Sequence, residues 1–253
     1  MKMIPKPCKV ENNAMKKIVI STAVRVLTSA LLLAIAAAGQ DVPGLMLSYK
    51  AKSDFALSAD PESAHWKKVT GVIAGTDPFG KPLPEARTDV RSRWTSKNLY
   101  FLFVSPYESL YPRPNPTPEK EAWGLWEYDV AEVFIGHDLK NIDLYKEFEV
   151  SPEGEFIDLD VDRLRKGKEV DWLWNSGLHY KTRIDRDRKV WICEMRIPWS
   201  SIDTRKPAPG NELRLNLYRI EGGPENRKYI VWQPIGNPSY HTPEKFGRMR
   251  LEK

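Results

Sequence analysis

Short runs of alternating apolar and polar side chains constrain the fold of this chain more than any other feature. About ten such runs follow one another after residue 69, and a period of two is typical of β-strands that bury one face. Turn signals such as PEG at 152–154 and PAPGN at 207–211 separate the runs. This part shows no sustained helical period. The pattern therefore predicts an all-β fold, an antiparallel β-sandwich of the jelly-roll type.

The strand predicted from Val130 directly follows the aromatic segment WGLWEYD at 123–129. Its alternation turns the odd-numbered apolar residues to one face and Glu132 to the other, so a carboxylate lies just below Trp126. This pairing suits a sugar, because C–H groups stack on the indole and hydroxyls donate to the acid. A core strand with a packed tryptophan at its start is the alternative interpretation.

Two hairpins are predicted on either side of this strand. The first joins residues 88–94 to 98–105, and the second joins 145–151 to 155–161 across the PEG turn. In the second hairpin, alternation places Glu147, Glu149 and Ser151 on the face opposite the core.

Two further segments are less regular. Residues 46–60 suggest only a possible edge strand at 55–59. Residues 106–119 contain five prolines and predict a stiff loop. We interpret this loop as a wall beside a binding cleft, because it brings Tyr107 and Tyr111 toward the aromatic segment.

The N-terminus has the features of a secretory signal. Basic residues precede the apolar run VLTSALLLAIAAA at 26–38, which ends in small residues suited to cleavage. We predict a signal peptide over residues 1–38, and a start at Met15 would give it a more ordinary length. An uncleaved anchor is the alternative, since residues 18–38 approach the length that spans a bilayer. The mature domain is then 39–253, secreted or periplasmic, with no stable membrane span.

Charge and cysteine content narrow the class of protein. Residues 1–38 hold six of the 39 basic residues and one of the 34 acidic residues, so the rest carries 33 of each and is formally neutral. A neutral domain has no basic footprint for a phosphate backbone, which argues against nucleic acid as a partner.

After cleavage of the predicted signal peptide, Cys193 is the sole thiol. It is predicted to be buried and inert, so the core must hold the domain together.

Catalytic motifs are absent from the sequence. It contains no G-x-S-x-G, Walker or H-E-x-x-H pattern, and its four histidines lack ligand spacing. A glycoside hydrolase stays open as an alternative, because Glu147 or Glu149 and Asp158 or Asp160 could lie near Glu132. A haem-binding sandwich is a second alternative. It would need axial ligands, whereas Met195 is predicted to be buried and Met249 is terminal.

Four motifs occur together in a specific order. They are WEYDVAEVFI at 126–135, EFEVSPEG at 147–154, W-x-x-E-x-x-I-P-W at 191–199, and WQP followed by YHTPEKFG ending at 247. From about residue 55 onward the chain resembles the family 9 carbohydrate-binding modules, which are sugar-binding β-sandwiches often attached to xylanases.

The resemblance implies a sugar site. In sugar-binding members two aromatic rings clamp a terminal sugar, and these positions fall on Trp126 and Tyr240. The accompanying acid falls on Glu132, and an amide position falls on Asn237. The resemblance therefore implies an exported, non-catalytic protein that stacks a sugar, such as a plant-polysaccharide terminus, and supports carbohydrate catabolism.

Two hydroxyl-binding positions depart from the family pattern. They are usually Arg and Asn, and here they are Glu149 and Ser151, while Tyr240 stands where the pattern has Trp. Glu149 accepts hydrogen bonds but donates none, and it carries the same charge as Glu132. No cofactor is expected, although the resemblance implies that clustered acids such as Asp129, Glu132 and Glu149 would tolerate a structural calcium ion.

Overall fold

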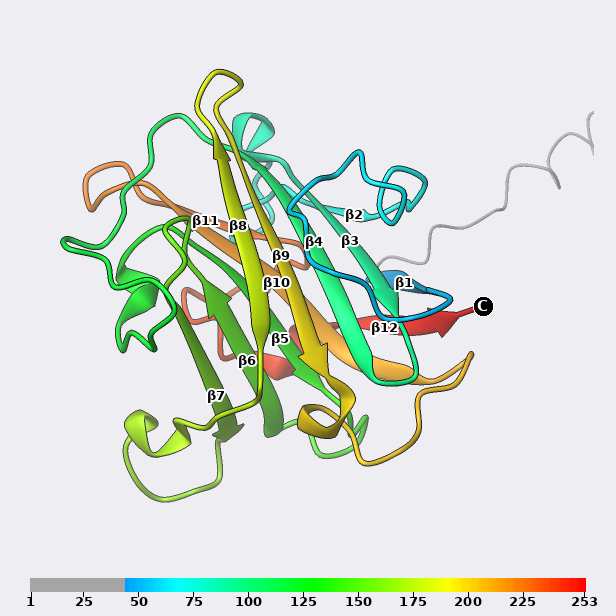
Figure 1. Ribbon diagram of the computed structural model, residues 1–253. Helices are drawn as coiled ribbons and strands as arrows, with labels where there is room; N and C mark the ends of the chain where they lie inside the picture. Colours follow the sequence, from blue (N-terminus) through cyan, green and yellow to red (C-terminus); the bar gives the residue numbers. More distant parts are fainter. Residues whose placement is uncertain (1–43) are drawn as a thin grey trace, which may run out of the picture. The chain divides into compact units, whose positions relative to one another are not determined.

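The computed structural model describes residues 44–253, so the predicted signal segment lies outside the described residues (Figure 1). This part consists of strands joined by loops and short 3-10 turns. The strands are β1 (Leu45–Lys50), β2 (Val72–Ala74), β3 (Thr88–Trp94), β4 (Asn98–Pro106), β5 (Val130–Gly136), β6 (Leu144–Val150), β7 (Phe156–Asp162), β8 (His179–Asp185), β9 (Val190–Pro198), β10 (Glu212–Glu221), β11 (Lys228–Val231) and β12 (Gly247–Glu252). The turns are η1 (Pro84–Ala86), η2 (Leu125–Glu127), η3 (Glu169–Trp172), η4 (Trp199–Ser201) and η5 (Pro243–Lys245).

One continuous sheet forms both layers of the fold. Its strand order is β7-β6-β5-β10-β12-β1-β3-β4-β9-β8, with β11 paired to β10 and β2 paired to β3. The sheet curls so that the β3-β4-β9-β8 half lies over the β10-β5-β6-β7 half (Figure 1). The predicted all-β sandwich is therefore confirmed.

The two halves meet at the first described strand. β1 pairs in parallel with both β12 and β3, whereas the other strand pairs run antiparallel. The alternation within residues 46–60 did not indicate this strand, and residues 55–59, the predicted edge strand, form no strand. Parallel partners lie far apart in sequence, so no turn signal marks them.

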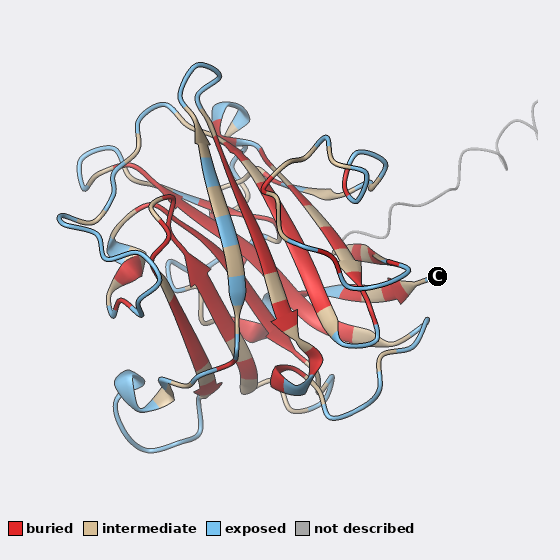
Figure 2. Ribbon diagram, viewed as in Figure 1, coloured by how far each residue is buried: buried red, intermediate tan, exposed pale blue. Residues whose placement is uncertain are grey.

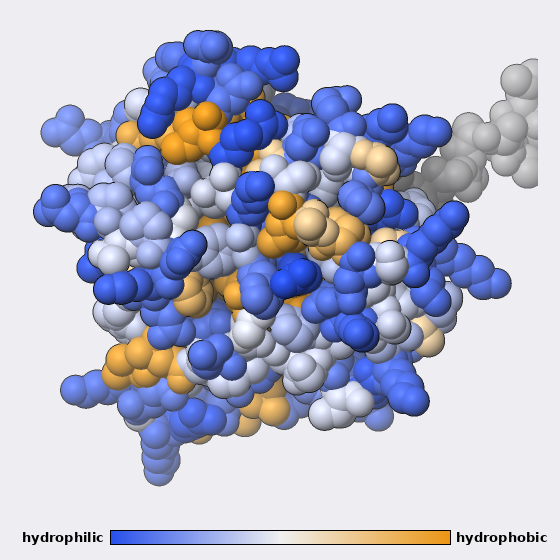
Figure 3. Space-filling view, in the orientation of Figure 1, coloured by the Kyte–Doolittle hydropathy of each residue, from blue (hydrophilic) through white to orange (hydrophobic). Residues whose placement is uncertain are grey.

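The hydrophobic core lies between the halves. Val133 of β5 and Phe148 of β6 belong to the same buried cluster as Phe101 of β4 and Met195 of β9. Buried residues are concentrated in the central strands, while β8 alternates between exposed and half-buried positions (Figure 2). The face seen in Figure 3 is largely hydrophilic, with only small apolar patches. None of the helical turns in residues 44–253 has the length and hydrophobicity needed to cross a membrane.

The outer faces of the two halves are covered differently. On the β4-β9 face, Phe55 and Trp66 from the segment after β1 pack over Tyr100. On the β5-β6-β10 face, Phe134 and Tyr218 belong to a second cluster, against which Trp126 and Tyr240 are half-buried. The predicted alternation of β5 is thus confirmed, and it places Glu132 on this second outer face.

Candidate functional site

A cavity of about 220 Å³ opens over the outer face of β5 and β6. Its walls are aromatic, and its floor is acidic. The principal lining side chains are Trp123, Trp126, Glu132, Phe134, Glu147, Glu149, Arg227, Tyr229, Tyr240 and His241. The cavity therefore combines flat apolar surfaces with acceptor groups, which is the chemistry of a site for a polar, hydroxylated ligand.

The tryptophan wall comes from the turn before β5. Gly124 has a φ of +80°, in the left-handed region that favours glycine, and it precedes η2. This turn brings Trp123 and Trp126 together edge to face, with ring centroids 4.9 Å apart and an interplanar angle of 82°. Trp123 is 42% exposed, and Trp126 is half-buried. Both rings therefore stand at the mouth of the cavity.

A second aromatic part of the lining comes from β11 and the loop after it. Tyr240 stacks on Tyr218 of β10, with ring centroids 4.1 Å apart and an interplanar angle of 12°. Tyr229 meets Tyr240 edge to face at 6.0 Å. Tyr218 thus covers one face of the Tyr240 ring. Tyr240 and Trp126 line the same cavity, but they are not partners in any aromatic contact among the described residues.

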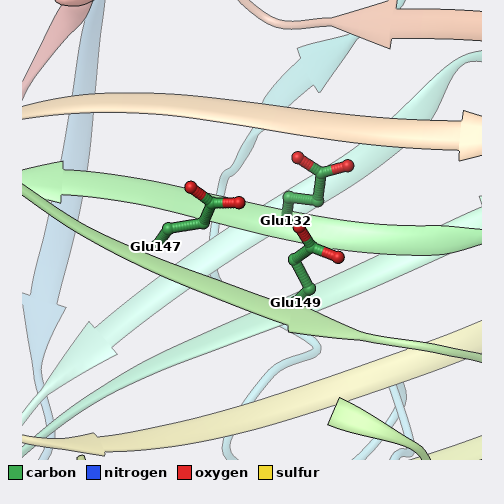
Figure 4. Close-up of side chains that lie close together, drawn as sticks. All are labelled: Glu132, Glu147 and Glu149. Atoms are coloured by element: carbon green, nitrogen blue, oxygen red, sulfur yellow. The ribbon is translucent and has the colours of Figure 1, made fainter. Parts of the chain in front are cut away.

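Three glutamates form the floor. Glu132 of β5 lies directly opposite Glu149 of β6 in the antiparallel register, and Glu147 lies two residues earlier on β6. One carboxylate oxygen of each lies within 4.8 Å of those of the other two, and the three side chains are grouped in Figure 4. All three side chains are buried, with exposures of 1%, 3% and 1% for Glu132, Glu147 and Glu149.

This burial perturbs the acids strongly. Within residues 44–253, one oxygen of each carboxylate has no hydrogen-bond partner. Burial raises the pKa of Glu132, Glu147 and Glu149 well above the usual value, and the charge of a neighbouring member of the trio raises it further. Without a cation, the cluster therefore holds protons at a pH where surface glutamates are ionised.

His241 lies beside Glu147 in the cavity lining. Its Nδ1 is hydrogen-bonded to the Tyr145 hydroxyl at 2.6 Å, and its Nε2 lies 3.9 Å from Glu147 Oε2. Burial, together with the charge of Arg163, lowers the pKa of His241 to about 4. The imidazole is therefore uncharged at neutral pH and does not neutralise the acids.

Four of the six predicted site residues line the cavity, namely Trp126, Glu132, Glu149 and Tyr240. The other two do not. β6 ends at Val150, so Ser151 lies in the following turn, where its buried hydroxyl accepts the Glu155 N–H at 3.0 Å. Asn237 is exposed, and its Oδ1 accepts the Ser239 N–H at 3.0 Å. Their predicted hydroxyl-binding roles stay predictions.

Asp129 does not join the acidic cluster, although we grouped it with Glu132 and Glu149 for calcium. Its Oδ1 accepts the Gly222 N–H at 2.6 Å, and its Oδ2 accepts the Tyr111 N–H at 2.9 Å. Both oxygens are thus used within the fold. The grouping with Asp129 is therefore wrong, because this side chain ties two loops to the start of β5.

The other carboxylates of the hydrolase alternative also lie elsewhere. Asp158 and Asp160 of β7 stand opposite Phe148 and Lys146, not opposite the cavity glutamates. A shift of one residue along a strand reverses the face. Asp158 accepts hydrogen bonds from Ser176, and Asp160 pairs with Lys146. Neither acid lines the cavity.

The proline-rich loop is not a wall of this cavity. Tyr111 stacks on Tyr128, with ring centroids 5.7 Å apart, and Tyr107 packs against the core cluster. Neither tyrosine is among the lining residues. The interpretation of residues 106–119 as a wall of this cavity is therefore wrong, because Tyr111 packs on Tyr128 and its N–H donates to Asp129.

Sequence reasoning missed several lining residues. Glu147 was assigned to the correct face by alternation, but it was left out of the site because the family pattern marks other positions. Tyr229 and Arg227 come from the segment entering β11, and no local signal connects them to β5.

The predicted burial of Cys193 and Met195 is confirmed, since both are 0% exposed.

The sequence matches a model of a known protein family. The model described as "Carbohydrate family 9 binding domain-like" matches residues 62–253. The chain belongs to this family. The match confirms the resemblance that the four motifs indicated, and it covers every lining residue of the cavity.

Relatives of this family 9 domain differ in size and context. The human UPF0462 protein C4orf33 is 27% identical over 175 residues, covering 66% of this chain and 81% of that protein. Endo-1,4-beta-xylanase A of Thermotoga neapolitana is 22% identical over 190 residues, covering 74% of this chain but 16% of the xylanase. The similarity to the xylanase is therefore confined to one part of a larger protein.

A solved structure supports the fold independently. A family 9 carbohydrate-binding module from Caldicellulosiruptor kristjanssonii, determined in complex with cellotriose, superposes with a TM-score of 0.59 at 15% identity. The alignment covers 82% of this chain and 93% of the module. At this identity the likeness establishes the fold, and the curled twelve-stranded sheet is thus that of the family 9 domains.

Proposed function

We propose that this family 9 domain is a non-catalytic sugar-binding protein whose ligand enters the cavity between Trp126 and Tyr240. One observation carries the proposal: these two aromatic side chains, distant in sequence, line the same cavity as Glu132 and Glu149. Family membership supports carbohydrate as the class of ligand.

The chemistry of the lining suits a single sugar ring. The Trp126 indole offers a flat surface for axial C–H groups, and Tyr240 would use the ring face that Tyr218 does not cover. The free carboxylate oxygens of the floor accept hydrogen bonds, and sugar hydroxyls supply the donors. A terminal residue of a plant polysaccharide fits this arrangement, because a chain end enters a cavity of about 220 Å³ more easily than an internal unit.

We further propose that the domain is exported, to the periplasm or the medium. The apolar run at 26–38, with basic residues before it and alanines at its end, supports export. There the domain would bind sugars released from, or still attached to, a polysaccharide that separate enzymes degrade.

Calorimetric titration with glucose, xylose and short cellulose- and xylan-derived oligosaccharides tests the binding proposal. Trp126→Ala should weaken binding by about 0.5 to 1.5 kcal/mol beyond the contribution of buried area, with an unchanged circular dichroism spectrum. Trp174→Ala is the matched control, because Trp174 packs against Phe148 and Lys146 outside the cavity.

The proposal fails if none of these sugars binds, or if Trp126→Ala binds as tightly as the unchanged protein. A product assay on xylan and cellulose separates binding from hydrolysis. New reducing ends that disappear in Glu132→Gln would identify a glycosidase instead.

A further inference from the structure

The acidic floor of the cavity lacks a counter-charge. Among the ion-pair contacts of residues 44–253, the trio Glu132, Glu147 and Glu149 has one, to His241 Nε2 at 3.9 Å. The guanidinium of Arg227, which also lines the cavity, is bound to Glu127. Three buried carboxylates within 4.8 Å of one another cannot all be ionised at low cost without a partner cation, so either protons or a bound cation must neutralise them.

Each carboxylate of the trio has a free oxygen. Oε1 of Glu132 and Oε2 of Glu147 and Glu149 have no hydrogen-bond partner in the described part of the chain, and each of these side chains is at least nine-tenths buried. Figure 4 shows the three carboxylates grouped over β5 and β6. Unsatisfied oxygens on three neighbouring residues are the donor set that a hard cation prefers.

The spacing selects the size of the cation. Calcium binds oxygen at about 2.3 to 2.6 Å, so two of its ligands can stand up to about 5.2 Å apart, whereas magnesium at about 2.1 Å limits them to about 4.2 Å. The three carboxylates offer oxygens within 4.8 Å of one another. The three glutamate side chains would therefore move less to bind calcium than to bind magnesium.

We propose that Glu132, Glu147 and Glu149 bind a calcium ion at the floor of the cavity, and that sugar hydroxyls complete its coordination. Calcium takes six to eight oxygen ligands, and three carboxylates cannot supply all of them unless each is bidentate. The remaining positions face the cavity, where a ligand or water reaches them. The calcium site rests on the geometry of the trio alone, whereas its contact with sugar rests on the proposed function.

The ion also accounts for the acid at position 149. An arginine there would donate to sugar hydroxyls, but Glu149 supplies only acceptors. A calcium ion between Glu149 and Glu132 restores positive charge at that place. The ion would thus take over the attraction for hydroxyl oxygens that a guanidinium otherwise provides.

The first experiment measures the metal without any sugar. The protein is stripped with a chelator, dialysed, and titrated with calcium chloride by calorimetry, with magnesium chloride in parallel. We expect one calcium per chain, weaker binding of magnesium, and a melting temperature that rises with calcium concentration. Glu147→Gln should weaken calcium binding at least about tenfold, the size of effect that even ligand-supporting groups produce.

Two features keep this result interpretable. Glu147→Gln preserves size and removes a buried charge, so its melting temperature without metal should equal or exceed that of the unchanged protein. Asp160→Asn is the matched control, because Asp160 lies on the neighbouring strand but outside the cavity, paired with Lys146. It should bind calcium normally. Absence of calcium binding at millimolar concentration would overturn the site.

The second experiment repeats the sugar titration with calcium and with chelator. We expect at least tenfold weaker sugar binding in chelator and in Glu147→Gln. Unchanged sugar affinity in chelator would overturn the proposed contact between calcium and sugar. If calcium binds but no sugar binds in either condition, the metal site stands and the proposed function fails, so the two failures are distinguishable.

Discussion

Replacing Asp129 by alanine should destabilise the domain, although Asp129 touches no ligand. Its two carboxylate oxygens accept separate backbone N–H groups, from Gly222 at the end of β10 and from Tyr111 in the proline-rich loop. The side chain is 1% exposed, and its bond to Gly222 is buried, whereas its bond to Tyr111 is partly buried. The substitution therefore leaves the buried Gly222 N–H without an acceptor and removes the acceptor of the partly buried Tyr111 N–H.

The magnitude follows from the two contacts. A hydrogen bond to a charged group contributes about 1.5 to 3 kcal/mol, so the pair contributes about 3 to 6 kcal/mol. Burial costs part of this, since it raises the pKa of Asp129 despite the opposing hydrogen bonds from Tyr111 and Gly222. We expect a net loss of about 2 to 4 kcal/mol in the free energy of unfolding.

Urea unfolding followed by tryptophan fluorescence measures this loss. Asp129→Asn keeps one acceptor oxygen and should give an intermediate value. Asp138→Ala is the control, because Asp138 also accepts two backbone N–H groups, those of Lys140 and Asn141, but near the surface. It should change stability less. A loss below about 0.5 kcal/mol for Asp129→Ala, the range of ordinary surface substitutions, would refute the reasoning.

Two further predictions concern other parts of the fold. Trp66→Phe removes the indole N–H that donates to Glu194 Oε1 at 2.8 Å. In urea unfolding, this variant should have a free energy of unfolding lower by about 1 to 3 kcal/mol. A smaller change would contradict the prediction and show that Oε1 finds another donor. Burial acts to raise the pKa of Asp54. Hydrogen bonds from the side chains of Thr95, Asn98 and Tyr100 outweigh this effect, so the pKa is lowered. Asp54 therefore stabilises the fold above its unfolded pKa, and this contribution is lost as pH falls through the folded value. The stability difference between the unchanged protein and Asp54→Asn should shrink from pH 6 to about pH 3 in guanidinium titrations, and a constant difference would contradict the assignment.

The strands were largely predictable from alternation, because apolar and polar residues alternate with a period of two in a strand that buries one face. The 88–94 and 98–105 hairpin, the strand from Val130 and the acidic face of β6 all follow from local residues. Alternation also separates Glu132 from the core before any coordinates are known. Alternation predicts which face of the sheet a side chain occupies, but it does not predict which side chains lie next to it on that face.

The remaining features depend on pairing between distant segments. Nothing near Leu45 indicates that β1 pairs in parallel with β12. Ser151 differs for a local reason, since β6 ends one residue earlier and the PEG turn uses its hydroxyl. Glu147 and His241 come together only because the loop after β11 folds back over β6. Neither the strand register nor the loop path is encoded in a short pattern.

The parallel seam at β1 has a consequence for how the domain is made. Leu45 pairs with Arg248, so the first described strand depends on a partner that follows it by most of the domain. Without β12, the strand ladder between β1 and β10 is missing, and such long-range pairing is slow to form. The curled sandwich is therefore completed only when β12 takes its place between β1 and β10.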